Sequence, residues 1–169
     1  MKTTSPRRIA CLAVPSLAFQ CALLGRPRLL GTPVALVDEF HARVADLTAE
    51  ARARGVRPGM PLREAVTLCP QLTVLEPRPA VVAQYADALV EAVAAVSPLV
   101  EEADQGLVFA DLHGLEWLYP TSAELERAVF AEVPEHLAGQ LGVADARFTA
   151  EMAALRARPG TAVHVSAAE

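Results

Sequence analysis

Apolar residues fall along the chain in two patterns, short continuous runs and three- or four-residue spacings, which predict strands and helices in alternation. Residues 8–14 (RIACLAV) form an apolar run typical of a buried strand, and Pro15 ends it. Residues 34–37 and 72–75 are two further runs, and we expect residues 43–46 to pair with the first of them. Alternation over residues 161–165 predicts a final strand.

Helix-period spacing is clearest after residue 78. The expected core face of this helix consists of Val82, Tyr85, Leu89, Val93 and Val96. Ser16 is expected to cap an earlier helix that carries Leu17 and Phe19.

Two later helices are predicted from their caps. Thr121 and Glu124 have the spacing of a capping box, and Pro134 must end that helix. Asp145 is a plausible cap for a last helix, which would present one face made of Phe148, Met152 and Leu155.

A hairpin is expected in the middle of the chain. Residues 99–102 and 107–111 are extended runs on either side of Asp104, Gln105 and Gly106, a favourable turn sequence. Strands and helices therefore interleave around a hairpin, which predicts an α/β or α+β fold with a mixed sheet. At 169 residues, the chain is long enough for one domain, or for one domain with a small subdomain.

Charge and cysteine content narrow the functional classes. The net charge is −5 and Lys2 is the only lysine, so strong autonomous binding to nucleic acid is disfavoured. Cys11, Cys21 and Cys69 have apolar surroundings and no metal-type spacing, so we expect buried free thiols. No apolar run approaches the length of a membrane span, and a cytoplasmic protein, associated with the nucleoid, is expected.

The stretch from residue 49 to 70, AEARARGVRPGMPLREAVTLCP, predicts two short helices around a rigid elbow. Gly55 is the kind of residue that ends a helix in the left-handed conformation. The Pro58-Gly59 dipeptide predicts a turn, and Pro61 suits the start of a second helix that would carry Leu62, Ala65 and Leu68 on one side.

This stretch resembles the fingers signature of Y-family translesion DNA polymerases, the DinB and UmuC group. The matching segments are Glu50-Ala51-Arg52, Gly55-Val56, Gly59-Met60-Pro61 and Leu68-Cys69-Pro70. The resemblance implies a palm made of residues 1–24 and 78–169 and a fingers subdomain of residues 25–77. The thumb and little finger that follow in such polymerases have no counterpart before Glu169.

In the family that the chain resembles, catalysis uses two magnesium ions held by carboxylates of the first strand and of the hairpin. When the family pattern is aligned with this sequence, its four carboxylate positions fall on Ala13, Pro15, Gly106 and Leu107. This sequence has Ala49 and Glu151 at the positions of the family's phosphate-binding tyrosine and lysine. It has Ala18 at the position of the bulky residue that serves as the family's sugar gate. The resemblance therefore implies an inactive relative of a DNA polymerase that needs no cofactor.

Two alternatives stay open from the residues. Around the hairpin, Glu102, Asp104 and Asp111 could supply a displaced metal site in a diverged polymerase remnant that retains nucleotide or DNA binding. A basic group is a candidate for phosphate or DNA contact, and equally a solvated face: Arg52, Arg54, Arg57 and Arg63.

In lacking all the expected metal ligands, the chain resembles the ImuB-like branch of the family. The segments DQGLVFADLHGL (104–115) and GVAD (142–145) are similar to motifs of that branch. The resemblance implies a non-catalytic adaptor in translesion synthesis and SOS mutagenesis. Its partners would be an error-prone C-family polymerase, a RecA-like accessory protein and the sliding clamp, and its contact with DNA would be weak or indirect.

Overall fold

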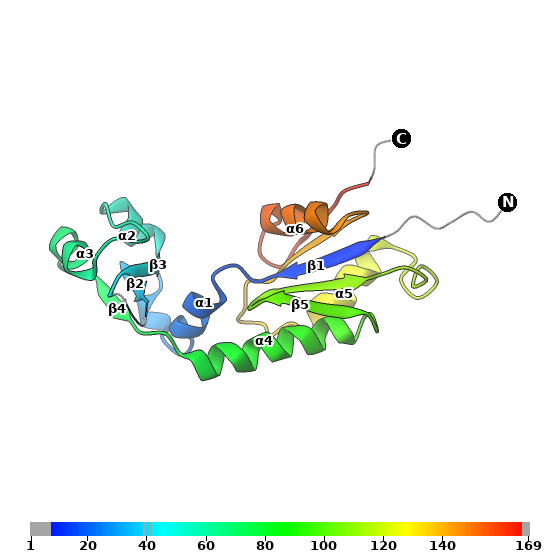
Figure 1. Ribbon diagram of the computed structural model, residues 1–169, viewed down its shortest axis with the longest axis horizontal. Coiled ribbons are helices and arrows are strands. Elements are labelled where there is room, and N and C mark those ends of the chain that lie inside the picture. The colour runs from blue at the N-terminus through cyan, green and yellow to red at the C-terminus, as the bar shows by residue number, and fades with distance from the viewer. Residues whose placement is uncertain (1–7, 39, 41, 167–169) are drawn as a thin grey trace. The chain divides into compact units, whose positions relative to one another are not determined.

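Helices and strands alternate along the chain and form two units (Figure 1). The computed structural model describes residues 8–38, 40 and 42–166. The smaller unit is Ser16–Val82, and the larger combines Met1–Pro15 with Ala83–Glu169. The sequence analysis drew the boundaries after residues 24 and 77. Helix α1 (Leu17–Leu23) accounts for the first difference, because its Phe19 and Ala22 pack with Val34, Leu36 and Leu75 of the smaller unit.

The larger unit is built on a five-stranded sheet in the order β5-β6-β1-β7-β8. Its strands are β1 (Ile9–Ala13), β5 (Val100–Asp104), β6 (Leu107–Asp111), β7 (Gln140–Ala144) and β8 (Ala162–His164). The central strand β1 is antiparallel to both β6 and β7, whereas β7 and β8 are parallel, so the predicted mixed sheet is confirmed. Every residue of β1 is buried, as the continuous apolar run predicted.

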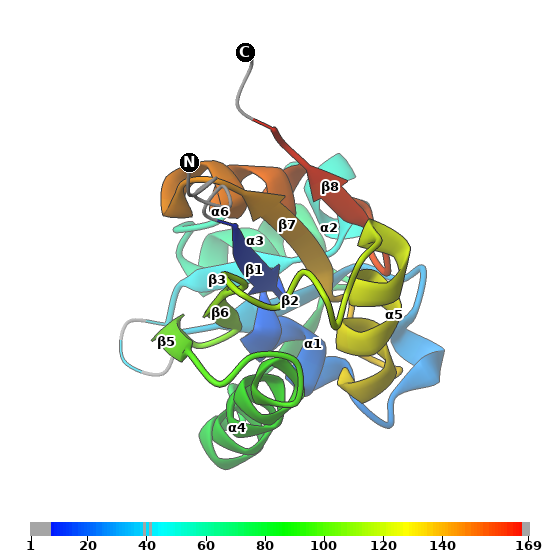
Figure 2. The same cartoon turned by 90° about the vertical axis from the view of Figure 1, so that its right-hand side faces the viewer.

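Helices cover both faces of this sheet (Figure 2). Figure 2 shows α4 (Pro79–Ala94) and α5 (Ser122–Glu132) on one face and α6 (Arg147–Arg156) on the other. The predicted core face of α4 is largely confirmed, because Val82, Leu89 and Val93 are buried while Tyr85 is partly exposed. A strand covered on both faces needs apolar residues at successive positions, which explains the run in β1.

Helix α6 lies unusually close to the sheet. A Cβ atom at Gly142 of β7 would stand 2.0 Å from the Ala150 carbonyl oxygen and 2.3 Å from the Ala154 nitrogen. Only a helix face made of small residues fits at this separation, so α6 buries Ala150, Ala153 and Ala154. The side that carries the large apolar residues does not pack on the sheet, because Phe148 is 71% exposed and Leu155 is 47% exposed.

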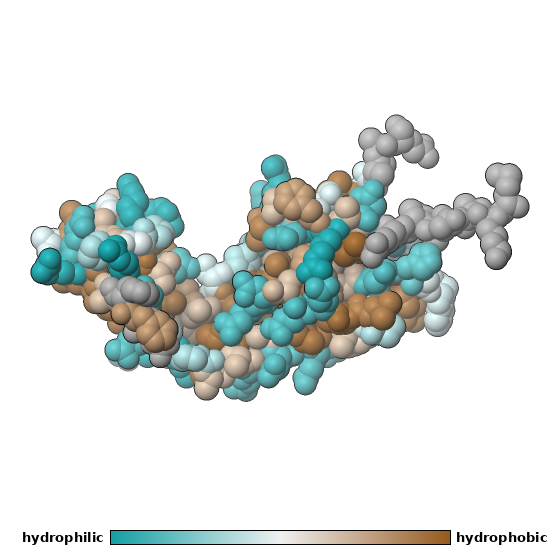
Figure 3. Space-filling model, in the orientation of Figure 1, coloured by the Kyte–Doolittle hydropathy of each residue, from teal (hydrophilic) through white to brown (hydrophobic). Residues whose placement is uncertain are grey.

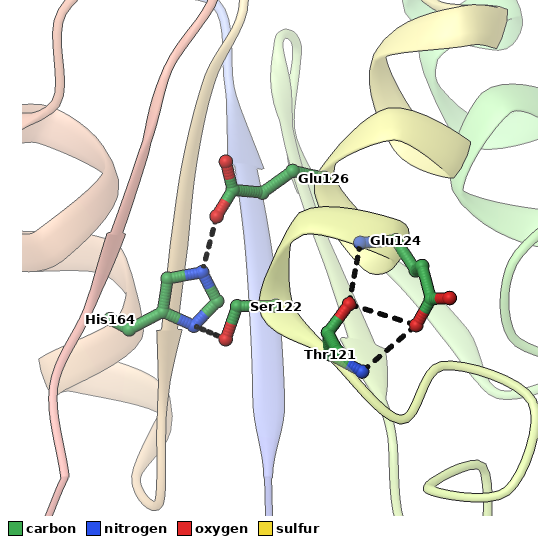
Figure 4. Close-up of polar contacts among 5 residues, drawn as sticks. All are labelled: Thr121, Ser122, Glu124, Glu126 and His164. Atoms are coloured by element: carbon green, nitrogen blue, oxygen red, sulfur yellow. Dashed lines mark hydrogen bonds and ion pairs between the residues drawn. The ribbon is translucent and has the colours of Figure 1, made fainter.

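The capping box of α5 is confirmed (Figure 4). The Glu124 N–H donates to the Thr121 hydroxyl at 3.3 Å, and the Thr121 N–H donates to the Glu124 carboxylate at 3.0 Å. The same helix holds the edge strand β8, because Glu126 lies 2.9 Å from Nε2 of His164 and Ser122 Oγ lies 3.4 Å from its Nδ1. The helix ends at Glu132, before Pro134 as predicted.

Two predicted caps are not formed. Ser16 occupies the N-cap position of α1, but it has a left-handed backbone with φ of 57° and its side chain makes no capping bond. The N-cap of α6 is Ala146 rather than Asp145, and again no side chain caps the helix. The left-handed backbone of Ser16 does not direct its side chain toward the first turn, whereas the extended N-cap position of α6 is occupied by an alanine, one residue after Asp145.

The smaller unit contains a three-stranded sheet in the order β3-β2-β4 and short helices. Its remaining elements are β2 (Val34–Val37), β3 (Val44–Leu47), β4 (Thr73–Leu75), the 3-10 helix η1 (Pro27–Leu29), α2 (Ala49–Ala53) and α3 (Leu62–Leu68). As expected, β2 pairs with β3, in antiparallel register, and β4 lies parallel on its other side. The Thr48 hydroxyl caps α2 and also accepts the Val34 N–H, which fixes the helix to the sheet.

The predicted elbow is confirmed. Gly55 has φ of 93° and Gly59 has φ of 80°, so both adopt the conformation that glycine favours. Between the two helices, Val56 is fully buried and packs in one cluster with Ala51, Ala65 and Cys69. Of the apolar side predicted for α3, Ala65 is buried together with Cys69, whereas Leu68 is 48% exposed.

The cysteine prediction is also confirmed, since Cys11, Cys21 and Cys69 are buried free thiols. Within the described part of the chain, the helices are too short or too polar to cross a bilayer.

Candidate functional site

The end of β1 meets the beginning of β6 at the positions where the resemblance placed metal ligands. Ala13 lies directly opposite Leu107 in the antiparallel register. The Val14 N–H donates to the Gly106 carbonyl at 2.7 Å, which continues the pairing into the hairpin turn. The structure therefore brings Ala13, Gly106 and Leu107 together, and Pro15 follows two residues beyond Ala13.

These positions carry apolar chemistry. Ala13 is 2% exposed and packs in a cluster with Ile9, Cys11 and Phe109, against which Leu107 also packs. Magnesium binds through carboxylate, carbonyl and water oxygens, and none of the four side chains provides one. Among residues 8–38, 40 and 42–166, no three His, Cys, Asp or Glu side chains are grouped so that they could hold a metal.

The acidic candidates of the hairpin are dispersed. Asp104 pairs with Leu107 at the turn end of β5, whereas Asp111 pairs with Ile9 at the opposite end of β6. Each carboxylate accepts a nearby backbone N–H, that of Gln105 for Asp104 and that of His113 for Asp111. Glu102 lies opposite Val108, between the other two.

Helix α6 places two charged residues beside the buried thiol of β1. Burial and, to a smaller extent, the Glu151 carboxylate raise the pKa of Cys11 to about 12, while the Arg147 guanidinium opposes the shift. Glu151 is the position at which the family pattern has a phosphate-binding lysine. A carboxylate at this position repels anions such as a triphosphate.

The basic candidates of the smaller unit are exposed and only partly grouped. The Arg57 guanidinium donates to the carbonyls of Arg52 and Val56, which holds it against the elbow backbone. Arg54 is exposed at the end of α2, whereas Arg63 lines a separate hollow of about 320 Å³ together with Glu64, Thr67 and Leu68.

The larger unit also contains a groove that the sequence analysis missed. It has a volume of about 650 Å³ and lies across the beginning of β5, the end of β6 and the start of α6; its lining residues are Ile9, Leu99, Val100, Glu101, Phe109, Ala110, Asp111, Asp145, Ala146 and Arg147. Arg147 lies 4.2 Å from the centre of the Phe109 ring and forms a 2.6 Å ion pair with Glu101. In the sequence, Leu99 looks like an ordinary strand residue. Its exposure, which marks the groove, is visible only in the structure.

The arrangement of strands and helices in both units matches that of known polymerases. The Dbh ternary complex aligns with a TM-score of 0.80 and 20% identity, over 95% of this chain and 48% of that chain. DinB from Sulfolobus solfataricus aligns with a TM-score of 0.75 and 17% identity, over 95% and 48% of the two chains. These structures show that the chain has the mixed α/β fold of Y-family polymerases over about half of their length.

Sequence relatives lead to the same family. The chain matches the impB/mucB/samB family over residues 14–155, and it belongs to this family. DNA polymerase IV of Pelotomaculum thermopropionicum is 32% identical over 138 residues, which are 79% of this chain and 34% of that protein. DNA polymerase IV of Alkaliphilus oremlandii is 25% identical over 146 residues, 83% of this chain and 37% of that protein. The chain thus spans about a third of the length of these curated relatives.

Proposed function

We propose that this chain is a polymerase-like scaffold without catalytic activity, which serves as an adaptor in a translesion or SOS-type DNA repair complex. The main support is the pairing of Ala13 with Leu107 beside Gly106. Phosphoryl transfer by the family requires two metal ions that bridge the triphosphate and the primer end. Side chains without oxygen leave those ions unbound, while the surrounding sheet is intact.

The replacement of the ligands by packed side chains supports a retained scaffold rather than a damaged enzyme. Ala13 and Leu107 contribute to a buried cluster that joins β1 and β6 to α6. The surface that remains is suited to binding other proteins. By the ImuB-like resemblance, the partners are an error-prone C-family polymerase, a RecA-like accessory protein and the sliding clamp.

The first test is genetic and uses the natural gene. Deletion should reduce DNA-damage-induced mutagenesis, and the wild-type gene should restore it. Because the proposed role needs no metal, the Glu102→Ala/Asp104→Ala variant should restore mutagenesis equally well. Pairwise co-expression should show that the wild-type protein co-purifies with the C-family polymerase or the RecA-like protein of the same organism.

A metal-binding measurement separates the adaptor from a diverged polymerase remnant. The electron paramagnetic resonance signal of Mn²⁺ should remain that of the free ion when the protein is added at millimolar metal. Bound Mn²⁺ that disappears in Glu102→Ala/Asp104→Ala, together with loss of complementation by that variant, would establish the remnant instead. Failure to co-purify with either partner would count against the adaptor.

A further inference from the structure

The groove in the larger unit is separate from the lost metal site. Both involve the same strands, but Ile9 lines the groove at one end of β1 and Ala13 marks the lost site at the other. Four residues of an extended strand span about 13 Å, so a ligand in the groove need not touch the former ligand positions. The groove is therefore available for a different kind of binding.

The groove combines an apolar floor with an exposed apolar rim. Ile9 and Phe109 are buried in the sheet and form the floor, whereas Leu99 on the rim is 66% exposed. Figure 3 shows hydrophobic residues gathered on the surface over the beginning of β5, beside hydrophilic ones. An exposed leucine next to an open hollow offers apolar area that a bound side chain would remove from water.

The charges around the groove determine which charged groups of a partner it attracts. The lining contains three carboxylates, those of Glu101, Asp111 and Asp145, against the single guanidinium of Arg147. Arg147 is already paired with Glu101, and the α6 N-terminus adds only about half a positive charge. The balance is negative, so the groove repels phosphate groups and attracts lysine or arginine.

The position of β5 at the edge of the sheet favours a partner segment in an extended conformation. β5 is the outermost strand of the described sheet beyond β6, and its residues Glu101–Asp104 are exposed. An extended segment added along such an edge directs alternate side chains to one face of the sheet. One of those side chains could enter the groove while the next positions remain in solvent.

We propose that this groove binds an extended segment of a partner protein, which carries a bulky apolar side chain flanked by lysine or arginine. The apolar side chain packs on Ile9, Phe109 and Leu99, and the cation lies near Asp145. This inference rests on the proposed function in one respect, that the chain works through protein contacts. Beyond that function, the groove is assigned as the surface of one such contact, and the chemistry of the bound segment is specified.

The probe is a phage-displayed library of random twelve-residue peptides, selected against the wild-type protein. Selected peptides should combine an aromatic or large aliphatic residue with lysine or arginine. In fluorescence polarisation with synthetic peptides, Leu99→Ser should weaken binding about tenfold or more, because the buried apolar contact is lost. Asp145→Lys should weaken binding at least about threefold, with the difference shrinking at high salt.

Matched controls test whether the effect belongs to the groove. Leu155→Ser removes a leucine that is 47% exposed elsewhere on α6, and Asp87→Lys reverses an exposed charge on α4. Both should bind the peptides like the wild type. Equal weakening by groove and control variants would show non-specific attraction to an acidic protein and overturn the proposal, as would selected peptides rich in Asp or Glu.

Two further outcomes separate this proposal from the adaptor role. Competition by a duplex oligonucleotide that is abolished by Arg147→Ala would show that the groove takes nucleic acid, which overturns the proposal. If Leu99→Ser and Asp145→Lys restore mutagenesis and co-purify with partners as the wild type does, the groove assignment fails while the adaptor stands. If Glu102→Ala/Asp104→Ala fails to complement and Mn²⁺ is bound, the adaptor fails whatever the peptides do.

Discussion

The two units differ in what their family-like positions contribute to the fold. In the smaller unit, Val56 and Cys69 of the fingers-like string are buried and Gly55 holds a backbone conformation that glycine favours. In the larger unit, Ala13 and Leu107, where the resemblance implies metal ligands, pair in regular register within the sheet. The comparison teaches that the stretch from residue 49 to 70 is mainly a packing requirement, and that β1 and β6 of the larger unit pair regularly without a carboxylate at Ala13 or Leu107.

The largest effect is expected where the larger unit is most tightly packed. Gly142→Ala would place a Cβ 2.0 Å from the Ala150 carbonyl, so strand and helix must separate. We expect a loss of about 3 kcal/mol or more in urea unfolding followed by circular dichroism, or failure of that unit to fold. Gly139→Ala is the control, because its Cβ would meet no backbone atom, only the side chains of Val133 at 3.3 Å and of Leu12 and Phe130 at 3.6 Å. Similar losses in both variants would contradict the proposed close packing.

A carboxylate introduced at Ala13 tests how closely the sheet packs around this position, where the resemblance implies a metal ligand. Ala13 is 2% exposed, so Ala13→Asp buries a carboxylate without an assigned partner. We expect a loss of about 2 to 3 kcal/mol at neutral pH. Burial raises the pKa of this Asp above its ordinary value, so part of the loss should disappear as pH falls and the carboxyl is protonated. Ala13→Asn should show no such pH dependence; a neutral effect of Ala13→Asp would mean that the site is still open.

The elbow should depend on its apolar residues and not on its arginines. Val56→Ala removes two methyl groups from a fully buried position and should cost about 2 kcal/mol. Arg52→Ala, in the same string but exposed, should change stability by less than about 0.5 kcal/mol. Thermal unfolding of the two variants provides the comparison. If Arg52→Ala were the more damaging, the string would be held by charge and the contrast between the units would fail.

The last effect concerns the thiol of β1 and appears only at alkaline pH. The pKa of Cys11 is raised to about 12 in the folded chain, above the ordinary value of 9.0. The stabilisation is therefore complete below pH 9 and is lost as pH rises toward 12, because only the unfolded chain releases the proton in that interval. The slope should be about 1.4 kcal/mol per pH unit. Urea titrations at several pH values should give a flatter profile for Cys11→Ala; identical profiles would place the thiol in contact with water.

Sequence reasoning succeeded where a local rule decides the structure. The continuous apolar run of β1, the capping box of Thr121 and Glu124, and the turns at Gly55 and Gly106 were all readable, because each depends on neighbours within a few residues. It failed at Ser16, whose left-handed backbone does not direct the side chain to the helix, and at Asp145, which lies one residue before the N-cap. The groove escaped detection because its lining comes from four separate segments of the chain.

The amino-acid sequence by itself determined the order of the elements, the elbow and the absence of oxygen ligands at the positions of the family pattern. Only the tertiary structure decided which face of α6 is buried. That helix has apolar residues on more than one side, so its periodicity allows either a large-residue face or an alanine face. The surface of the neighbouring strand makes the choice, since Gly142 admits the helix so closely that only alanines fit. The same choice leaves Phe148 in solvent, next to Arg147 of the groove.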